Sequence, residues 1–579
     1  MASSSPSSNS VNRAARRSLA SRGGALGTGG VLVAGTAAAL LTAFAGQAGA
    51  AATITVDSSG DGTATASNCT DSMPGNCTIR DAAALAVDGD TIIFGASVTS
   101  ITLTDGQIAL GAVNITGPGS ASLAITTTAT AGSYNLFYFS GTGDVTVSGL
   151  SITKQRIKTS NQGKFTLNDV SISDSYFSYG GALYATNQSD LVISGSHFEN
   201  NSAGLKGGAV YAVNNGTVTV SDTEFINNTV FSGNGGGIFS KDSGAQFTLT
   251  GSTVTGNSAT RGGGISVATT ALVSIADSTI SSNTSTSDGA GLYSIVASSA
   301  NPPAAVSIER STFDDNTLTG SGEGGGMKVG GRSLEVTNST ISNNSSGNIG
   351  GGISVSEAAV ATINNTTITG NSAAGNGGGL YANGGVVTIN QGTIAANTAG
   401  DKAGGVWLYR DSLTLSGTIV SGNSSVASGY EDVGGYLDGL YSDHSLVGNV
   451  DGAFVTDEGG TIRSTTPGLD VLADNGGPTM TMGLLTGSAA IDAGPNPVAT
   501  FTGNGFDQRG TPFVRVFNGT VDIGAFEVQD TPTPTSSTTS SSTTSTLAPT
   551  SSTTTSTMGI DPTTSTAAED DPVAPTFTG

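Results

Sequence analysis

The feature that most constrains the fold is a repeat of about 28 residues in the middle of the chain. In each unit an isoleucine, valine or phenylalanine is followed three positions later by an asparagine, and a glycine cluster comes shortly after. Self-similarity at this period is typical of solenoids, in which each unit packs mainly on its two neighbours. The asparagines are Asn201, Asn228, Asn257, Asn283, Asn316, Asn344, Asn371, Asn397 and Asn423.

The segments between these markers predict strands. They are short alternating runs rich in β-branched residues, such as "VVTI" and "LTLS", and they lack the long 3.6-residue period of helical repeats. Stacking such units pairs each strand in parallel with its copy in the next unit. We therefore expect an all-β fold, a right-handed parallel β-helix with three short strands per coil.

The glycines and asparagines are expected at the corners of the coils. Glycine adopts positive φ freely and lets backbones of successive coils approach closely. An asparagine amide both donates and accepts, so asparagines at one corner could hydrogen-bond along the stack. We interpret both residue types as structural.

The residue between two inward-facing positions after each glycine corner should face outward. Six of these nine residues are aromatic in a chain that is only 6% aromatic. In stacked coils they would form an interrupted stripe that could bind glycan rings or a partner protein. The same rings could instead stabilise the stack or lie beneath variable loops. The predicted ligand-binding residues are Tyr184, Tyr211, Phe239, Tyr293, Tyr381 and Trp407.

Composition shifts divide the chain into five parts. Residues 1–50 have the basic, apolar and small-residue order of an export signal peptide. Residues 51–95 form an N-terminal cap with a short helix, because Thr78 and Asp81 are spaced as a capping box. Residues 96–465 are expected to be β-helix coils and 466–528 a C-terminal cap. Residues 529–579, rich in Ser, Thr and Pro, are expected to be a disordered stalk.

Two terminal segments carry a family resemblance. "NCTIRDAAALAVDGDTIIF" (76–94) resembles the CSLREA-type N-terminal segment of bacterial β-helix proteins, with Thr, Ile and Asp replacing its Ser, Leu and Glu. "DNGGPTMTMGLLTGSAAIDAG" (474–494), "DQRG" (507–510) and "VDIGAFE" (521–527) resemble the choice-of-anchor Q domain, with Met482 where a histidine is expected and "TPFVR" in place of a tighter Pro-Arg. The repeats between them resemble those of polymorphic outer-membrane proteins. The resemblance implies an exported β-helix protein of uncharacterised function, often followed by a surface anchor.

The net charge limits the kinds of partner that we expect. Beyond residue 50 the chain has 16 basic and 43 acidic residues, which argues against nucleic acid as a partner.

The two cysteines indicate a covalent link. Cys69 and Cys77 are expected to form a local disulfide in an exported protein. Two cysteines with the distant His197 and His444 offer too few ligands for zinc, so we expect no metal and no cofactor. No stretch of the mature chain is long and apolar enough to span a bilayer.

Catalytic residues are not evident in the sequence. Hydrolysis needs two converging carboxylates, and elimination needs a base with neutralisation of a uronate. The most suggestive acidic pair is Asp314–Asp315, but adjacent strand residues point to opposite faces. Asp492, Asp507, Arg509, Asp522 and Glu527 could form a polar site, although pairing of Arg509 with one of these acids is the simpler interpretation.

These observations lead to three functional hypotheses. The first is a secreted or cell-surface protein with a non-catalytic adhesive or envelope role, binding a glycan or a surface protein through the aromatic stripe. The alternative is a polysaccharide lyase or glycoside hydrolase acting on an extracellular polysaccharide, and we lean against an enzyme. The third is a purely structural rod.

Overall fold

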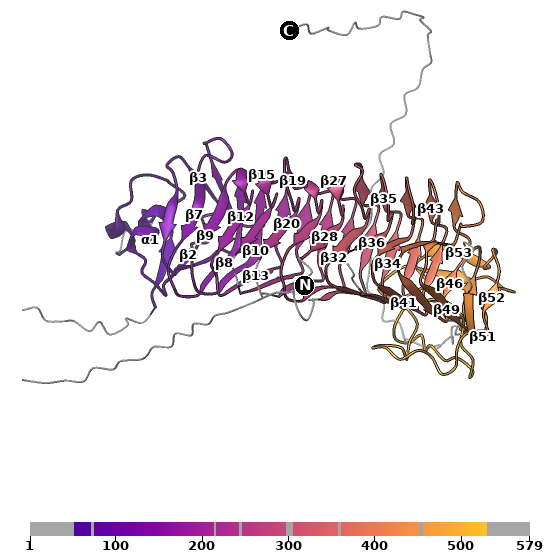
Figure 1. Cartoon of the computed structure of the whole chain (residues 1–579). Helices are drawn as coiled ribbons and strands as arrows, with labels where there is room; N and C mark the ends of the chain where they lie inside the picture. The colour runs from indigo at the N-terminus through magenta and orange to yellow at the C-terminus, as the bar shows by residue number, and fades with distance from the viewer. Residues whose placement is uncertain are drawn as a thin grey trace, which may run out of the picture.

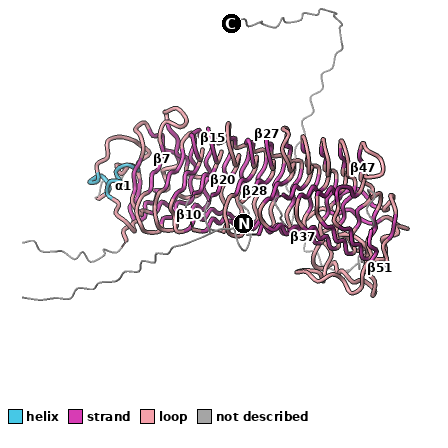
Figure 2. The backbone as a smooth tube through the Cα atoms, in the orientation of Figure 1, coloured by secondary structure: helices cyan, strands magenta, loops and turns pink. Residues whose placement is uncertain are grey.

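The computed structural model describes residues 51–529 except 71–74, 214–215, 242–245, 297–304, 357–359 and 451–454. The predicted export signal (1–50) lies outside the described residues, as does all of the predicted stalk except Gln529. The described chain forms an elongated stack of coils whose strands run side by side along the rod (Figure 1). Almost all of its regular structure is strand, with helix confined to the N-terminal end (Figure 2). The predicted all-β solenoid is therefore confirmed.

Three parallel sheets run along the rod. Sheet B contains 13 strands, one per coil, which agrees with a β-helix of about 13 coils. Its strands are β4 (Ile108–Leu110), β7 (Asn135–Phe139), β9 (Arg156–Thr159), β12 (Leu183–Thr186), β16 (Val210–Val213), β20 (Ile238–Lys241), β24 (Ile265–Val267), β28 (Leu292–Ile295), β32 (Met327–Gly330), β36 (Ile353–Ser356), β40 (Leu380–Asn383), β44 (Val406–Tyr409) and β48 (Val433–Tyr436).

Sheet C is shorter and begins further along the chain. It has ten strands, which precede the glycine corners. They are β11 (Tyr176–Tyr179), β15 (Ser202–Lys206), β19 (Thr229–Val230), β23 (Ser258–Arg261), β27 (Thr284–Asp288), β31 (Thr317–Leu318), β35 (Ser345–Ser346), β39 (Ser372–Ala373), β43 (Thr398–Ala399) and β47 (Ser424–Ser425).

Sheet A has 29 strands because most coils contribute two segments to it. The first arm consists of β1 (Thr53–Val56), β2 (Thr91–Phe94), β5 (Asn114–Thr116), β8 (Val145–Thr153), β10 (Phe165–Ser173), β13 (Asp190–Ser194), β17 (Thr217–Ser221), β21 (Phe247–Thr250), β25 (Val273–Ala276), β29 (Ala305–Glu309), β33 (Ser333–Thr337), β37 (Val360–Asn364), β41 (Val386–Asn390), β45 (Ser412–Ser416), β49 (Gly439–Asp443) and β51 (Val455–Gly459). The second arm consists of β3 (Ser100–Leu103), β6 (Ala124–Thr127), β14 (His197–Glu199), β18 (Glu224–Ile226), β22 (Thr253–Thr255), β26 (Thr279–Ser281), β30 (Thr312–Asp314), β34 (Thr340–Ser342), β38 (Thr367–Thr369), β42 (Thr393–Ala395), β46 (Ile419–Val420), β50 (Leu446–Val447) and β52 (Ile462–Arg463).

Most coils contain more than the three strands that the sequence predicted, because the strand of sheet A is divided into two segments. β8 and β10 span both arms, but from β13 onward a bend separates them. Residues in the left-handed region, such as Gly195 and Asp222, interrupt the ladder at this bend. A serine or threonine follows the bend, and its hydroxyl accepts a backbone N–H from the preceding coil, as Ser252 does from Thr223 at 3.2 Å.

The interior of the rod is apolar and tightly closed. Inward isoleucine, valine, leucine and phenylalanine side chains from the three sheets form one continuous cluster. Phe198 and Phe225 stack in successive coils with ring centroids 5.1 Å apart. Burying these apolar side chains away from water is the main driving force for a fold of this kind.

The asparagine ladder predicted from the repeat is confirmed. Asn316 shows the pattern: its Oδ1 accepts from the backbone N–H of Asn283 at 3.1 Å and from the Nδ2 of Asn283 at 2.9 Å. Its own Nδ2 donates to Oδ1 of Asn344 at 2.9 Å and to the carbonyl of Ile280 at 2.9 Å. The same bonds link the asparagines from Asn201 to Asn423, so each buried amide is satisfied by its neighbouring coils.

The glycine corners also meet the expectation. Gly377 has φ +69°, which favours glycine. At Gly379 a Cβ atom would lie 2.8 Å from the carbonyl oxygen of Gly405 in the next coil. Glycine is needed here because backbone, and not a movable side chain, occupies the space.

The N-terminal end is closed by the short helix α1 (Ile79–Leu85), which follows the 3₁₀ turn η1 (Ala66–Cys69). The predicted capping box is present, since Thr78 and Asp81 exchange side-chain and backbone hydrogen bonds. Ile79 and Ala82 are fully buried in the core. Cys69 and Cys77 are joined by a disulfide with Cα atoms 4.7 Å apart.

The C-terminal segment, residues 467–528, packs along the side of the rod. We expected a cap at the end, but its contacts lie on the outer face of the second arm of sheet A, over β34, β38 and β42. Thr340 Oγ1 donates to the carbonyl of Met480 at 2.6 Å, and Thr367 Oγ1 donates to Oε1 of Gln508 at 2.7 Å. Outward Ile419 and Leu446 in the last coils are fully buried beneath it, which gives the apolar reason for this position. The segment includes the antiparallel pair β53 (Leu469–Ala473) and β54 (Thr481–Leu484).

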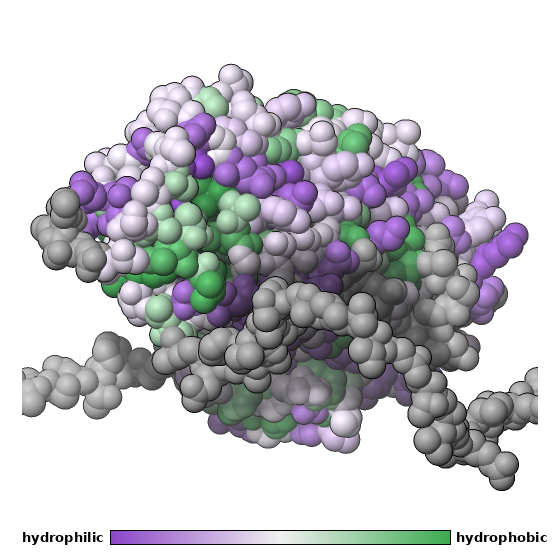
Figure 3. Space-filling model, turned by 90° about the vertical axis from the view of Figure 1, so that its left-hand side faces the viewer, coloured by the Kyte–Doolittle hydropathy of each residue, from purple (hydrophilic) through white to green (hydrophobic). Residues whose placement is uncertain are grey.

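The surface at the N-terminal end is a mixture of hydrophilic, near-neutral and apolar residues (Figure 3). Within the ranges that the structure describes, no helix has the length and apolar content required to cross a membrane.

Candidate functional site

The outward aromatic residues form one row on sheet B. Strand pairing places Tyr184 opposite Tyr211, Tyr211 opposite Phe239, and Tyr381 opposite Trp407. The register assumed in the sequence analysis is therefore confirmed. We call the following residues the outward row: Tyr138, Lys158, Tyr184, Tyr211, Phe239, Ser266, Tyr293, Lys328, Ser354, Tyr381 and Trp407.

Three consecutive rings of the row, which follow Lys158, stack face to face. Tyr184 and Tyr211 have centroids 5.1 Å apart and planes 16° apart, and Tyr211 and Phe239 have centroids 5.5 Å apart and planes 11° apart. Both faces of the Tyr211 ring are consequently occupied by its neighbours. The row offers ring edges, and not open ring faces, to a ligand in this part.

Two predicted site residues are largely hidden from solvent. Phe239 is 2% exposed and Trp407 is 7% exposed. The Lys206 ammonium lies 4.6 Å from the ring centroid of Phe239, and Lys402 lies 5.7 Å from that of Trp407, which also contacts Tyr436 edge-on. The expected open stripe is thus interrupted, because long side chains from the glycine corner cover the rings. Tyr184, Tyr211, Tyr293 and Tyr381 are half-buried.

A second row flanks the first and was not identified from the sequence. It consists of the residue directly before the positive-φ glycine in the six corners from Gly180 to Gly324, and inspection of that one position in every repeat could have found it. Register places Tyr179 opposite Lys206, and Asn234 between Lys206 and Arg261. We call the following residues the corner row: Tyr179, Lys206, Asn234, Arg261, Asp288 and Glu323.

The two rows are cationic and aromatic toward the N-terminal end. The Lys158 ammonium lies 5.0 Å from the ring centroid of Tyr138 and 5.6 Å from that of Tyr184. The guanidinium of Arg156 lies 3.9 Å from the ring centroid of Phe177 and donates to Oδ1 of Asn135 at 2.7 Å. Burial lowers the pKa of Arg156 to about 10, so it stays charged at neutral pH.

Charges in the middle of the two rows are paired with one another. Asp288 accepts from Arg261 Nε at 2.9 Å and from Lys328 Nζ at 2.9 Å, and Lys328 lies 3.3 Å from Glu323. Burial would raise the pKa of Asp288, but the hydrogen bonds from Lys328 and Arg261 outweigh it and lower that pKa. For Lys328, burial opposes the charged form, and the bond to Asp288 with the charge of Glu323 outweighs burial and raises the pKa. Because these four charged side chains pair with one another, few unpaired charges remain here to bind a ligand.

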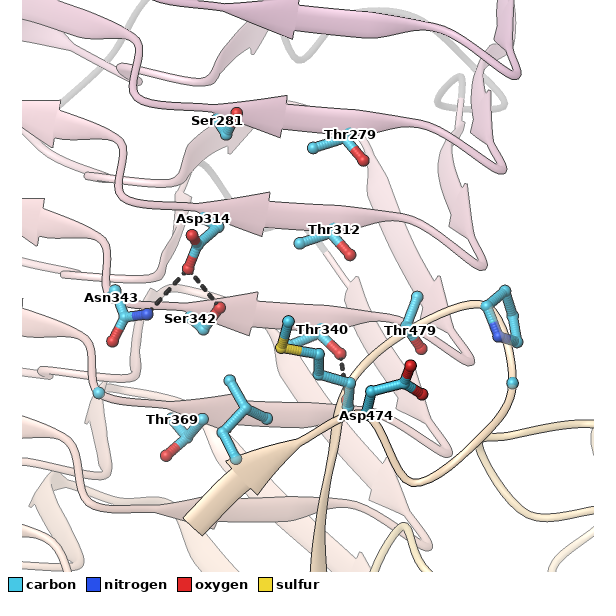
Figure 4. Close-up of a pocket in the computed structure, with 15 residues that line it drawn as sticks. Thr279, Ser281, Thr312, Asp314, Thr340, Ser342, Asn343, Thr369, Asp474 and Thr479 are labelled. Atoms are coloured by element: carbon cyan, nitrogen blue, oxygen red, sulfur yellow. Dashed lines mark hydrogen bonds between the residues drawn. The ribbon is translucent and has the colours of Figure 1, made fainter. Parts of the chain in front are cut away.

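A cavity of about 730 Å³ lies between sheet A and the C-terminal segment (Figure 4). Hydroxyl side chains of β26, β30 and β34 line one wall, and Leu472 to Met480 contribute to the other. Asp314 and Asp474 line it from different elements, and Asp314 accepts from Ser342 at 2.6 Å and from Asn343 at 2.9 Å. Asp315 does not line this cavity, which agrees with the expectation that the Asp314–Asp315 pair does not converge.

The predicted polar residues of the C-terminal segment form a buried ionic cluster. Arg509 binds Asp507 through Nη2 to Oδ2 at 2.6 Å, as expected, and its guanidinium lies between Phe513 and Phe526. Arg515 is fully buried and lies 3.8 Å from Glu527. Burial raises the pKa of Glu527 to about 8. These contacts hold the segment together and leave no open catalytic pair among them.

The described residues show no metal-binding geometry. No group of three or more His, Cys, Asp or Glu side chains within the described ranges could hold a metal ion. His197 contacts Glu224 at 2.8 Å on sheet A, and His444 contacts Asp443 at 2.6 Å.

Comparison with known proteins places the chain among β-helices. No curated protein matches the sequence. The crystal structure of tailspike protein 3 of bacteriophage CBA120 is similar at 15% sequence identity and a TM-score of 0.36, over 65% of this chain and 54% of the tailspike chain. The chain therefore spans about half the length of that protein. The family described as a right-handed β-helix region matches residues 28–280 and 263–464, and the chain belongs to this family.

Proposed function

We propose that the chain is an exported protein, secreted or held at the cell surface, with a non-catalytic role in which sheet B binds an extracellular glycan. The observation that carries this proposal is the in-register row of Tyr184, Tyr211 and Phe239 with the lysines beside it. Residues of this row in successive coils follow one another at the strand spacing of about 4.8 Å, and such a linear arrangement suits a linear polymer.

The stacked geometry changes how such a glycan would be held. Because neighbouring rings cover one another, recognition relies on ring edges, phenol hydroxyls and ammonium groups. The hydroxyl of Tyr184 makes no hydrogen bond within the described part of the chain. A half-buried phenol with an open hydroxyl matches a sugar surface, where apolar C–H groups alternate with hydroxyls.

The family resemblances also favour an exported protein. We infer that residues 76–94 are a CSLREA-type segment and that 474–527 are a choice-of-anchor Q domain, both of which are found in exported bacterial β-helix proteins. The contacts of the C-terminal segment with β34, β38 and β42 suit a domain that accompanies the β-helix.

A glycan array with the full chain tests the proposal. Tyr184→Phe keeps the ring stack and removes one hydroxyl, whereas Tyr184→Ala also removes the ring. We expect weaker binding in the order wild type, Tyr184→Phe, Tyr184→Ala. Tyr441→Phe is the matched control, because Tyr441 is an exposed tyrosine on sheet A. Unchanged binding by both Tyr184 variants, or an equal loss in the control, would reject the assignment to sheet B.

Polysaccharide cleavage is the second candidate function. It is favoured by one observation, the cavity that Asp314 and Asp474 line from different elements (Figure 4). The assay is release of reducing ends or unsaturated uronates from a polysaccharide panel, with Asp314→Asn as the test variant. Turnover that Asp314→Asn abolishes would overturn the non-catalytic role.

A further inference from the structure

We infer that the glycan bound by sheet B is anionic, carrying sulfate or uronate carboxylate groups, and that Lys158 and Lys206 recognise those groups. This inference rests on the proposed function and specifies its ligand.

Lys158 is the first of the two recognition residues. It lies in the outward row, paired with Tyr138 on one side and Tyr184 on the other. Its ammonium lies near both rings, at 5.0 and 5.6 Å from their centroids. Within the described chain this ammonium has no carboxylate partner and no hydrogen-bond acceptor. Ring contacts hold it in place without using its N–H donors.

Lys206 has the same arrangement in the corner row. Its ammonium lies 4.6 Å from the ring centroid of Phe239 in the following coil. It also forms no ion pair with a described residue. Two lysines held by aromatic rings and left without counter-charges therefore lie on the same face.

The aromatic setting, and not the lack of an ion pair alone, distinguishes these two lysines from an ordinary surface lysine such as Lys164. The chain beyond residue 50 has far more acids than bases, and ion pairs among the described residues link six of its 16 basic residues to carboxylates. Those paired cations are Arg80, Arg261, Arg310, Lys328, Arg509 and Arg515. An acidic protein that leaves two lysines unpaired among aromatic rings presents a local site for anionic groups.

The surrounding acids do not cancel this local charge. Within the two rows the first carboxylate after Lys206 is Asp288, three coils further along. Three strand spacings are roughly 14 Å, which exceeds the Debye length of about 8 Å at physiological ionic strength. Asp288 is moreover bound to Arg261 and Lys328.

The spacing of the lysines favours a polymer over a single anion. Lys158 lies on β9, and Lys206 precedes β16, two strands away in sheet B. Their backbones are thus separated by roughly 10 Å along the rod. One small anion cannot bridge that distance, whereas an extended glycan with repeated acidic groups can contact both lysines.

Affinity measurements on the full chain test the inference. The probes are dextran sulfate, polygalacturonate and neutral dextran, each at low and high salt. We expect the sulfated or the uronate polymer to bind, with an affinity that falls as salt rises. Lys158→Gln and Lys206→Gln should each weaken binding roughly tenfold, the loss expected for one charge-assisted hydrogen bond.

The control is Lys164→Gln, because Lys164 is an exposed lysine beside β10 on sheet A. It should leave binding unchanged, and Lys158→Arg should retain most of it. Which of the two charged polymers binds distinguishes sulfate from carboxylate recognition.

Three outcomes overturn the inference in different ways. Equal binding of neutral dextran, with no effect of salt or of the lysine variants, would refute the anionic ligand and leave glycan binding intact. Absence of binding to every glycan, including those of the array, would reject the proposed function as well. Single-stranded DNA bound as tightly, and with the same lysine dependence, would replace the glycan by nucleic acid.

Discussion

Asn423 ends the asparagine ladder on the carboxylate of Asp432. The backbone N–H and the Nδ2 of Asn423 both donate to Oδ1 of Asp432, each at 2.9 Å, and Oδ2 accepts from the backbone N–H of Asn449 at 2.8 Å. An ionised carboxylate only accepts hydrogen bonds. It therefore suits the last position of the ladder, because it accepts from Asn423 and has no N–H group that would need an acceptor in a further coil. Burial raises the pKa of Asp432, against the hydrogen bonds from Asn423 that lower it.

Replacing Asp432 should destabilise the C-terminal coils. Asp432→Ala leaves the two buried donors of Asn423 and the half-buried N–H of Asn449 without an acceptor, and we expect a loss of about 3 kcal/mol in the free energy of unfolding. Asp432→Asn keeps the acceptor for Asn423 but turns a donor toward Asn449. The free energy of unfolding should therefore fall less for Asp432→Asn than for Asp432→Ala. Urea denaturation of the three proteins checks the order. An alanine variant as stable as wild type would show that the end of the ladder does not matter.

Asn316 in the middle of the ladder should be equally sensitive. Asn316→Ala removes four buried hydrogen bonds and opens a gap between Asn283 and Asn344, so we expect about 3 kcal/mol of destabilisation. Asn383→Ala is the control, since Asn383 is exposed at the end of β40. Thermal unfolding followed by circular dichroism compares the two, and equal melting temperatures would contradict the structural role of the ladder.

The corner glycines should tolerate no side chain. At Gly378 a Cβ atom would overlap the carbonyl oxygen of Thr398 and lie 2.5 Å from that of Gly404, both backbone atoms of the next coil. We expect Gly378→Ala to cost about 4 kcal/mol or more, or to prevent folding. At Gly106 nothing lies within 4 Å, so Gly106→Ala should be close to neutral. Yield of soluble protein and its melting temperature provide the measurement, and a stable Gly378→Ala would mean that the coils are further apart than described.

The C-terminal segment should loosen as the pH rises. Burial raises the pKa of Glu527 from 4.5 to about 8, so the folded state keeps a proton that the unfolded state loses near 4.5. This contribution to stability is fully present below about 4.5 and is lost as the pH rises to about 8. Hydrogen exchange of residues 505–528 across this range measures it. Glu527→Gln should flatten the dependence, and a wild-type protein without any pH dependence there would contradict the shifted pKa.

The repeat period predicted the strand register of the outward row but not the orientation of its rings. The period of the repeat was enough to predict that Tyr184, Tyr211 and Phe239 are neighbours, because parallel coils pair each residue with its copy one period later. It did not predict that their rings stack face to face, or that Lys206 covers Phe239. Ring orientation depends on rotamers and on side chains that reach over from another sheet.

The amino-acid sequence by itself determined the solenoid, its inward and outward faces, the asparagine ladder, the glycine corners and the capping box at Thr78 and Asp81. All of these depend on spacing along the chain, which the strand and helix periods convert directly into position. Only the tertiary structure decided that the Lys206 side chain lies over the ring of Phe239, and that residues 467–528 lie along sheet A. Both depend on contacts between residues far apart in sequence, such as Thr340 with Met480, and no local period encodes them.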